Sequence, residues 1–301
     1  MRGLDYDDEK WDALLDQLTP SDYQTLITQS GYGTAAIKSV DKPSTTDRDT
    51  ATGLVNYGFD ASGNLYFKGN ITHCGVIVLA QTYNDDLATH YGENIGDESY
   101  YLGVDGWYAP AVNMHRTAFS GRNSEYYSED PFIGGHIASL ECEGVASRGM
   151  YVFVKHYAIN DQEDHRGDRE GQYSIATFLN EQAAREIYLK PFEMSVKDAD
   201  CHAVMSSFNY IGNRWAGGCS ELLQNVLRGE WGFLGFVETD YFGVYGYMTA
   251  DQAVRNGGDL MLCTTGNDYN NVTVLTNSSK QAMRTSAKNI LYTCLLYTSD
   301  A

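Results

Sequence analysis

The sequence has little positive charge and no long apolar run. Its 301 residues include 21 Lys and Arg against 40 Asp and Glu, which gives a formal net charge of −19. A surface this acidic repels nucleic-acid phosphates and anionic lipid headgroups. The longest apolar runs, such as residues 75–80, are far shorter than the roughly 20 residues of a membrane-spanning helix. Binding to nucleic acid or to a membrane is therefore not expected.

The sequence also lacks the spacings that mark metal and nucleotide sites. None of its six cysteines forms a C-x-x-C pair or has a histidine at zinc-binding spacing. No G-x-G-x-x-G follows an expected strand, and G-x-x-x-x-G-K-[ST] is missing. We expect no metal and no cofactor, and we interpret the cysteines as buried thiols of a reducing compartment. The acidic opening MRGLDYDDEKWD has no apolar signal-peptide segment, which slightly favours a cytoplasmic location.

Tyrosine and acidic residues, by contrast, are abundant. Aromatic residues make up 13% of the chain, and 23 residues are tyrosine. This composition suits sugar binding, because rings stack on sugar faces and carboxylates accept hydrogen bonds from hydroxyls. An ordinary, well-packed acidic protein without a sugar site has the same composition, so the motifs must decide.

Short apolar runs alternate with amphipathic segments along most of the chain. The pattern predicts strands at residues 75–80, 107–112, 151–156, 203–207, 236–239 and 259–262. It predicts helices at residues 85–102, 133–149, 175–198, 219–231, 248–256 and 279–293, after a helical N-terminal region that breaks at Pro20. Repeated βα order indicates a parallel sheet. We expect an α/β fold, a (β/α)8-like TIM barrel whose early strands are irregular because residues 31–70 are rich in loop formers.

Polar residues follow several of the expected strands, where a barrel enzyme carries its active site. They are Asn113, His115 and Arg116, then Lys155 and His156, then Ser206, Ser207 and Asn209, and finally Asp240. Such groups are costly to bury without a polar ligand or mutual pairing. We therefore expect them to meet at one end of the barrel.

Six segments resemble motifs of glycoside hydrolase family 3. GRNSEYYSEDP at residues 121–131 resembles GRNFEYxSEDP, KHYAINDQEDHR at 155–166 resembles KHFAxNxQExxR, and REIYLKPF at 185–192 resembles the end of LREIYLxPF. MSSFN at 205–209 resembles MxSYN, GFLGFVETD at 232–240 resembles GFxGxVxTD, and DTATGL at 49–54 is a degraded match to DGPAGL. The resemblance spans nearly the whole chain and implies the barrel domain of this family.

The resemblance implies a retaining hydrolase that removes β-linked glucose or xylose from non-reducing ends. A retaining glycosidase uses a carboxylate nucleophile and an acid/base about 5–5.5 Å away. Asp240, at the end of the 236–239 strand, matches the nucleophile. The expected sugar-binding residues are Asp49, Arg122, Lys155, His156, Met205 and Tyr241.

Each of these residues has a structural alternative. Asp240 could cap a helix or form an ion pair, and Arg122 could pair with Glu125, Glu129 or Asp130. Asp49 could be a turn residue and Met205 a core residue. Lys155 and His156 are neighbours on a strand, so one could be solvated while the other is buried.

The chain departs from the family pattern at two positions beside the nucleophile. Phe208 replaces the tyrosine of MxSYN and so lacks its hydroxyl, while Tyr241 replaces a frequent tryptophan. The charged run at residues 163–170 is interpreted as a solvated loop with internal ion pairs, in which Arg166 supports the site.

The family's acid/base glutamate lies in a separate α/β sandwich domain, for which residues 1–293, assigned to the barrel, leave no room. The opening LDYDDEKWDALLDQLT resembles the junction of a branch in which that domain precedes the barrel. The expected partners are therefore a glycoside substrate and the missing domain of the same polypeptide. Residues 294–301, CLLYTSDA, resemble a translated sequencing adapter and are predicted to be a non-native tail that follows a helix ending near residue 293. The alternative is a genuine C-terminal tail.

Three other functions are alternatives to this interpretation. The β-N-acetylhexosaminidase branch of the same family carries KHFPGHG, where this chain has KHYAIND. A non-catalytic sugar-binding barrel is favoured by Phe208 and by the missing acid, and is opposed by the intact Asp240, Lys155, His156 and Arg122. A phosphate-binding aldolase-like barrel is opposed by the acidity and by the lack of a glycine-rich phosphate loop.

Overall fold

The computed structural model describes residues 1–29, 31–55, 57–67, 69, 71–164, 166, 174–241, 246–263 and 271–297. Its α-helices are α1 (Lys10–Leu15), α2 (Pro20–Thr28), α3 (Val76–Gln81), α4 (Asp85–Leu102), α5 (Pro131–Ala146), α6 (Glu181–Ala183), α7 (Lys190–Lys197), α8 (Ala250–Arg255) and α9 (Asn277–Tyr297). Short 3-10 helices are η1 (Lys38–Val40), η2 (Asn123–Glu125) and η4 (Ala216–Gly218), and π-helices are η3 (Ala184–Tyr188) and η5 (Glu221–Glu230). The strands are β1 (Asp47–Asp49), β2 (Tyr57–Phe59), β3 (Leu65–Phe67), β4 (Gly106–Tyr108), β5 (Tyr151–Tyr157), β6 (Ala176–Thr177), β7 (Ala203–Ser206), β8 (Tyr210–Ile211), β9 (Arg214–Trp215) and β10 (Phe236–Thr239).

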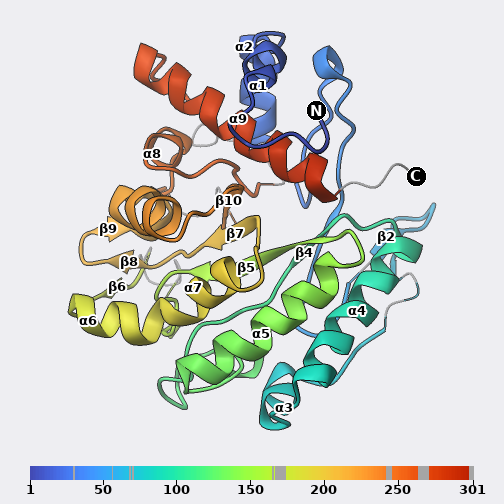
Figure 1. The fold of residues 1–301 in the computed structure, drawn as a ribbon, viewed down its shortest axis with the longest axis vertical. Helices are drawn as coiled ribbons and strands as arrows, with labels where there is room; N and C mark the ends of the chain where they lie inside the picture. The colour runs from blue at the N-terminus through green and yellow to red at the C-terminus, as the bar shows by residue number, and fades with distance from the viewer. Residues whose placement is uncertain are drawn as a thin grey trace.

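The central element of the described chain is a five-stranded parallel sheet in the order β1-β4-β5-β7-β10 (Figure 1). Four of its strands were predicted from the sequence, and their parallel arrangement is confirmed. Residues 259–262 continue the sheet beyond β10, because Leu260 forms a parallel bridge with Glu238 and accepts a hydrogen bond from the Thr239 N–H (2.9 Å).

Backbone hydrogen bonds lead from this last segment back to the first strand. The Met261 N–H donates to the carbonyl of Ile27 at 2.8 Å, and the Asp47 N–H donates to the carbonyl of Tyr32 at 2.8 Å. The segment between α2 and β1 therefore lies between the two ends of the strand series.

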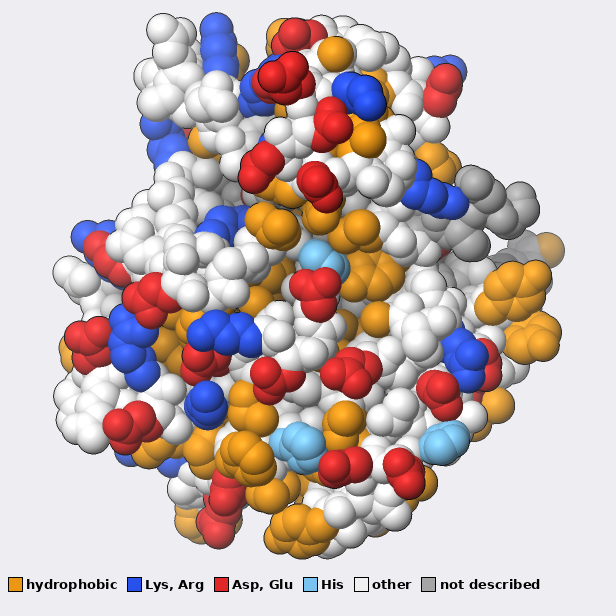
Figure 2. Space-filling view, viewed as in Figure 1, with side chains coloured by type: hydrophobic (Ala, Val, Ile, Leu, Met, Phe, Trp, Pro, Cys, Tyr) orange, Lys and Arg blue, Asp and Glu red, His pale blue; other side chains and the backbone are white. Residues whose placement is uncertain are grey.

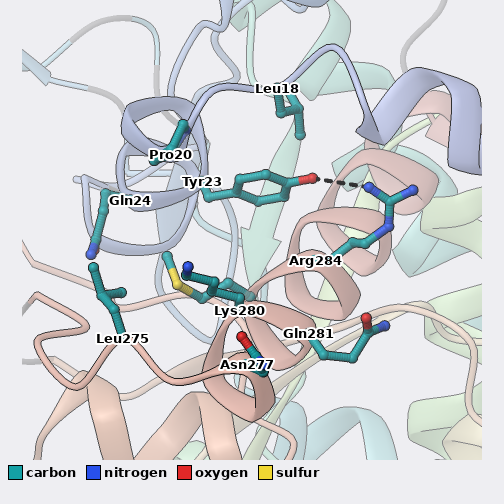
Figure 3. A pocket seen from close by; sticks show the side chains of 10 residues that line it. Leu18, Pro20, Tyr23, Gln24, Leu275, Asn277, Lys280, Gln281 and Arg284 are labelled. Atoms are coloured by element: carbon teal, nitrogen blue, oxygen red, sulfur yellow. Dashed lines mark hydrogen bonds between the residues drawn. The ribbon is translucent and has the colours of Figure 1, made fainter.

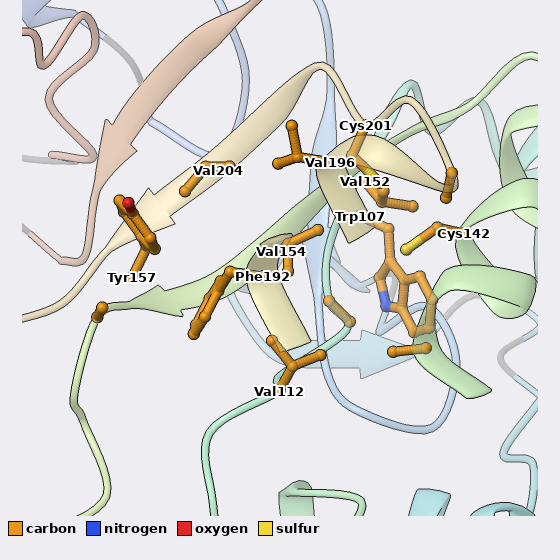
Figure 4. Close-up of a cluster of buried hydrophobic side chains, with 14 of the residues drawn as sticks. Trp107, Val112, Cys142, Val152, Val154, Tyr157, Phe192, Val196, Cys201 and Val204 are labelled. Carbon is orange, nitrogen blue, oxygen red and sulfur yellow. The ribbon is translucent and has the colours of Figure 1, made fainter. Parts of the chain in front are cut away.

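The two faces of the sheet pack against different helices, as Figure 1 shows for α4 and α5 on one side and α1, α2 and α9 on the other. Side chains alternate between the faces along each strand. Trp107, Val152, Val154 and Val204 belong to the cluster that includes residues of α4, α5 and α7 (Figure 4). The alternate positions join residues of α1, α2 and α9 in a second cluster, which contains Tyr108, Phe153, Met205, Phe236 and Leu260.

Helices α4 and α5 approach one another through glycines. A Cβ atom at Gly92 would lie 2.1 Å from the carbonyl oxygen of Glu141, and one at Gly144 would lie 2.2 Å from that of Thr89. The backbones of the two helices are therefore in direct contact.

Asp130 begins α5 by accepting hydrogen bonds from the N–H groups of Phe132 and Ile133 (2.8 and 3.1 Å).

Several local predictions were wrong. Residues 75–80 were expected to form a strand but begin α3, in which Val76, Leu79 and Ala80 are buried and Val78 is 55% exposed. That spacing is helical, but a short apolar run cannot distinguish the two states. The helix expected at 175–198 is divided into β6, α6, η3 and α7, and α9 continues past residue 293 to Tyr297. The irregularity expected early in the chain is seen in the three-residue β1 and the antiparallel β2–β3 hairpin.

The structure shows where the acidic residues and the cysteines of the sequence lie. Acidic side chains are spread over the face seen in Figure 2 rather than gathered in one patch. Five of the six cysteines are buried as expected, whereas Cys74 is exposed. Within the described ranges, no helix is long and apolar enough to cross a membrane.

Candidate active site

Asp240 lies immediately after β10, at the carboxyl end of the parallel strands. Its N–H donates to the carbonyl of Ser206 at 3.0 Å, so the pairing of β10 with β7 extends to the backbone of Asp240. Its side chain is only 13% exposed. The Tyr241 N–H donates to Oδ1 at 2.7 Å, whereas Oδ2 has no hydrogen-bond partner among the described residues. One carboxylate oxygen is thus oriented by the backbone, and the other is buried without a hydrogen-bond partner among the described residues.

The ionisation of Asp240 reflects two opposed effects. Burial raises its pKa to about 6, while the positive charges of Arg122 and Arg166 and the Tyr241 N–H act in the opposite direction. A carboxyl group with this pKa is mostly ionised at neutral pH despite its burial. The site therefore holds a negatively charged oxygen in a largely dry environment.

His156 lies beside Asp240 and is uncharged. Arg122 donates from Nη1 to His156 Nε2 at 2.7 Å, which requires a lone pair on that nitrogen. Burial, together with Arg122 and Lys155, holds the pKa of His156 well below its ordinary value. The separation of 3.8 Å between Nε2 and Asp240 Oδ2 is therefore not an ion pair. The proton of the neutral ring is on Nδ1.

Lys155 connects two carboxylates across the site. Its Nζ lies 2.9 Å from Asp49 Oδ1 and 2.9 Å from Glu125 Oε1. Burial alone would lower the pKa of Lys155, but the charges of Asp49 and Glu125 raise it. Burial opposes ionisation of Asp49, and the Lys155 charge outweighs it, so the pKa of Asp49 is lowered. The half-exposed Asp49 at the end of β1 is thus brought to the site by an ion pair.

Lys155 and His156 both belong to the site although they are neighbours on β5. The register between β5 and β7 shifts between Val154 and Tyr157, so strict alternation ends there. The Lys155–His156 peptide bond is cis. Asn113 fixes this point by donating to the His156 carbonyl (3.1 Å) and accepting from the His156 N–H (2.8 Å).

Glu163 joins two arginines. It lies 2.9 Å from Arg122 Nε and 3.1 Å from Arg166 Nη1, and it accepts a hydrogen bond from Asn160 Nδ2 at 2.8 Å. The side chains of Glu163 and Arg166 are 16% and 9% exposed. The predicted ion pair within the charged run is therefore present between Glu163 and Arg166, but the predicted solvation is wrong for these two residues, because both side chains are largely buried. Residues 165 and 167–170 of that run lie outside the described part of the chain.

The aromatic ring of Phe208 packs against the guanidinium of Arg166. The guanidinium lies over the Phe208 ring, 4.7 Å from its centroid, and Phe208 is 7% exposed. A ring without a hydroxyl is sufficient for this cation–π contact. The substitution of Phe for the motif tyrosine therefore retains a support for the arginine.

The remaining predicted residues and polar strand ends have supporting positions. Met205 is buried in the cluster with Phe153 and Phe236, which agrees with its structural alternative. Tyr241 is partly buried against the same cluster. His115 contacts the carbonyls of Asn123 and Tyr126 through Nε2 (2.9 and 2.7 Å) and so holds the 121–131 loop.

Two further residues of the site, Glu125 and Asn160, are not among the residues that the sequence predicted for it. Glu125 was considered only as an alternative partner for Arg122, from which it lies 3.6 Å away, yet it also pairs with Lys155. Asn160 Oδ1 accepts from Arg166 Nη1 at 2.7 Å. Both lie within the recognised motifs, so their position there was the available signal.

Some cavities of the molecule lie apart from these residues. A cavity of about 450 Å³ lies between α2 and the start of α9, where Tyr23 and Arg284 face one another (Figure 3). None of the predicted site residues lines it. In the part of the chain that is described, no group of three or more His, Cys, Asp or Glu side chains could hold a metal ion.

Comparison with known proteins gives one consistent result. Residues 62–290 match the family model described as the glycosyl hydrolase family 3 N terminal domain. The chain is 40% identical over 197 residues to beta-glucosidase B of Emericella nidulans, covering 64% of this chain and 22% of the relative. It is 32% identical over 252 residues to a beta-glucosidase of Rhizobium radiobacter, covering 83% and 29%.

Solved structures agree with the sequence relatives. Beta-glucosidase 3B from Thermotoga neapolitana, solved in complex with glucose, superposes with a TM-score of 0.81 at 30% identity over 96% of this chain and 43% of that chain. The Kluyveromyces marxianus beta-glucosidase in complex with glucose has a TM-score of 0.82 at 26% identity, covering 96% and 34%. The predicted TIM-barrel-like α/β fold is confirmed, and the chain spans less than half the length of each of these proteins.

Proposed function

The chain belongs to glycosyl hydrolase family 3, and on that premise we propose that it is the nucleophile-bearing barrel domain of a retaining β-glycosidase. The single observation that carries the proposal is the setting of Asp240, a buried carboxylate with one oriented and one unpartnered oxygen at the end of the parallel strands. The relatives' names support a β-glucosidase.

In the proposed first step, Asp240 Oδ2 attacks the anomeric carbon of a β-glycoside. The bond from that carbon to the leaving oxygen breaks, and a covalent glycosyl–Asp240 ester forms. The Tyr241 N–H keeps Oδ1 aligned, and the cationic Arg122 and Arg166 favour the ionised carboxylate. Water then attacks the anomeric carbon and gives up a proton to the general acid/base. The bond from that carbon to Asp240 breaks, which releases the sugar and the Asp240 carboxylate.

The substrate class follows from the groups around Asp240. Lys155, Asp49 and Arg122 offer charged donors and acceptors, and His156 Nδ1 is a buried donor without a hydrogen-bond partner among the described residues. This mixture suits a neutral ligand with several hydroxyls, whereas a phosphorylated ligand would meet the nearby carboxylates. We propose glucose or xylose in β-linkage at a non-reducing end.

We further propose that the general acid/base belongs to an α/β sandwich domain of the same polypeptide. Three carboxylates of the described site, Asp49, Glu125 and Glu163, each bind a Lys or Arg. A carboxylate engaged in this way has no proton to give a leaving oxygen. The short coverage of the relatives is consistent with a further domain.

The proposal is tested with 2,4-dinitrophenyl 2-deoxy-2-fluoro-β-glucoside, whose leaving group needs no protonation. Intact-mass measurement should show one added fluoroglycosyl group, and peptide mapping should place it on Asp240. Asp240→Asn should abolish labelling, whereas Asp164→Asn, which changes an exposed carboxylate next to Glu163 in the segment after β5, should not. Labelling at a different carboxylate would contradict the assignment.

A non-catalytic sugar-binding protein is the second candidate, because the DTATGL and MSSFN segments depart from the family pattern. It predicts that glucose binds and that no covalent adduct forms with the fluoroglucoside. The same pair of measurements therefore separates the two candidates.

A further inference from the structure

We propose that Tyr32 is a substrate-contacting residue that closes the sugar pocket between Asp240 and Asp49. The proposal rests on the function proposed above and adds a residue that none of the recognised motifs contains. It comes from the loop-rich tract at residues 31–70, which the sequence left without a function.

The position of Tyr32 follows from how the strand series closes. Asp240 follows β10 and Asp49 ends β1, at opposite ends of the order β1-β4-β5-β7-β10. The chain that spans this gap is tied to one side by the Met261 N–H bond to Ile27 and to the other by the Asp47 N–H bond to Tyr32, both 2.8 Å. The ends of the strands surround the site, and Tyr32 therefore occupies the position of the strand end that is missing between β10 and β1.

The side chain of Tyr32 packs on buried core residues beneath the site. Its ring centroid lies 5.5 Å from that of Tyr108, with an angle of 42° between the rings. Tyr108 is buried, and its hydroxyl donates to Glu238 at 3.3 Å. Tyr32 and Tyr241 both pack, partly exposed, against the apolar cluster that contains Tyr108. One face of Tyr32 is thus supported by the core while part of the side chain stays accessible.

The charges near Tyr32 are those of the site. Burial raises the pKa of Tyr32, and the negative charge of Asp49, the phenols of Tyr57 and Tyr241, and Asp240 raise it further. The phenol consequently keeps its proton. Among the described residues its hydroxyl has no hydrogen-bond partner, so it can donate to a sugar hydroxyl.

The backbone holds Tyr32 in an uncommon conformation. Its φ is 56°, a left-handed value that a bulky side chain rarely adopts. The next residue, Gly33, passes so close to residue 45 that a Cβ would lie 2.0 Å from the Thr45 carbonyl oxygen. The Thr34 N–H then donates to Thr45 Oγ1 at 2.8 Å. Residues 32–34 are therefore held against residue 45, just before β1, which fixes the backbone from which the Tyr32 side chain extends.

These observations give Tyr32 two functions toward a pyranose. Its ring offers an apolar surface for the C–H face of the sugar, and its hydroxyl offers one donor between two carboxylates. Both act on binding of the sugar rather than on the bond being broken. We therefore expect Tyr32 to affect affinity more than the chemical step.

The test measures the concentration dependence of inactivation by 2,4-dinitrophenyl 2-deoxy-2-fluoro-β-glucoside. Tyr32→Ala should raise the inactivator concentration for half-maximal rate by about three- to tenfold, as expected for loss of one aromatic contact. The limiting rate should stay within about twofold. Tyr32→Phe, which keeps the ring, should show a smaller increase. The control is Tyr100→Ala, an exposed tyrosine of α4 whose loss should leave both values unchanged.

The outcomes separate this inference from the proposed function. Unchanged half-saturation in Tyr32→Ala would overturn the inference while Asp240 labelling still stood. A purely structural role would lower the melting temperature and the fraction of labelled protein without changing half-saturation. If the unmodified chain does not label, saturation-transfer NMR with glucose decides. Weaker transfer in Tyr32→Ala than in Tyr100→Ala supports the inference, and equal transfer overturns it.

Discussion

At the scale of single residues, the ionisation of Asp240 controls the proposed reaction. The carboxyl group is buried beside Arg122 and Arg166, and its pKa is raised to about 6. Only the ionised form can attack, so labelling should be slow at pH 5 and should level off above pH 7. Each unit of pH below 6 should cost about tenfold in rate.

Arg166 provides the matching variant. Its guanidinium lies on Phe208 and is one of the charges that lower the pKa of Asp240. Arg166→Gln should therefore move the midpoint of the pH–rate profile upward by about one unit. Arg185→Gln removes an arginine from the exposed pair with Glu230 and should leave the midpoint unchanged. A midpoint that stays near 6 in Arg166→Gln would remove Arg166 from this function.

The ionised form of Asp240, which prevails above about pH 6, should reduce the stability of the folded chain. Its pKa is higher in the folded chain, about 6, than the ordinary value of 3.8, so the folded state binds the proton more tightly. This tighter proton binding stabilises the folded state fully below pH 4, and the stabilisation is lost as pH rises through 6. Asp240→Asn should therefore raise the free energy of unfolding at pH 8 by up to about 3 kcal/mol and change it little at pH 4. Urea denaturation at the two pH values measures the difference, and an equal effect at both would contradict this account.

At the scale of elements, the contact between α4 and α5 depends on the missing side chains of Gly92 and Gly144. A methyl group at Gly92 would collide with the Glu141 backbone rather than with a flexible side chain. Gly92→Ala should thus lower the free energy of unfolding by about 1–3 kcal/mol. Gly75→Ala is the control, because no atom lies within 4 Å of its Cβ position and its φ is −61°. Equal denaturation midpoints for the two variants would show that the helices can separate without cost.

The elements also show how far the sequence could lead. The strands β5, β7 and β10 were predicted because each contains a short apolar stretch followed by polar residues, and the structure shows all three to be buried along their length. Residues 75–80 have the same composition yet form a helix, since the distinction depends on burial from tertiary neighbours. The shift within β5 that brings Lys155 and His156 together is likewise a consequence of pairing with β7. The motif contained these residues but not their geometry.

Within the candidate site, the residues that belong to motifs could be predicted from the sequence. The residues that only the closure of the strand series brings to the site could not. Asp240, Arg122 and Lys155 were identified from spacing that resembles one family. A charged run such as the one around Glu163 predicts a solvated loop, and only the fold brings Arg122 to Glu163. Tyr32 lies in a loop-rich tract, and nothing in its local pattern indicates that this segment closes the strand series.

At the scale of the whole molecule, the proposed separation of the nucleophile from the acid predicts a selective loss of activity. Protonation of a leaving oxygen is typically worth about 10²–10⁴-fold and matters most for sugar leaving groups. The purified chain should therefore release dinitrophenol from 2,4-dinitrophenyl β-glucoside while leaving cellobiose nearly intact. Azide should accelerate the second step, because it needs no general base. Rapid cellobiose hydrolysis would show that a carboxylate of this chain serves as the acid.

The hydrogen bonds at Asp240 have a consequence for amide exchange with solvent. The Asp240 N–H is held by the Ser206 carbonyl within the sheet, whereas the neighbouring Tyr241 N–H is held by the Asp240 carboxylate. Exchange at Asp240 should require separation of β7 from β10, and its protection factor should not depend on the charge of the site. Protection at Tyr241 should fall as the carboxylate is protonated below pH 6 and should be weak at every pH in Asp240→Asn. Two adjacent amides, followed by NMR across this range, would thus report separately on the opening of the sheet and on the charge of the proposed nucleophile, Asp240.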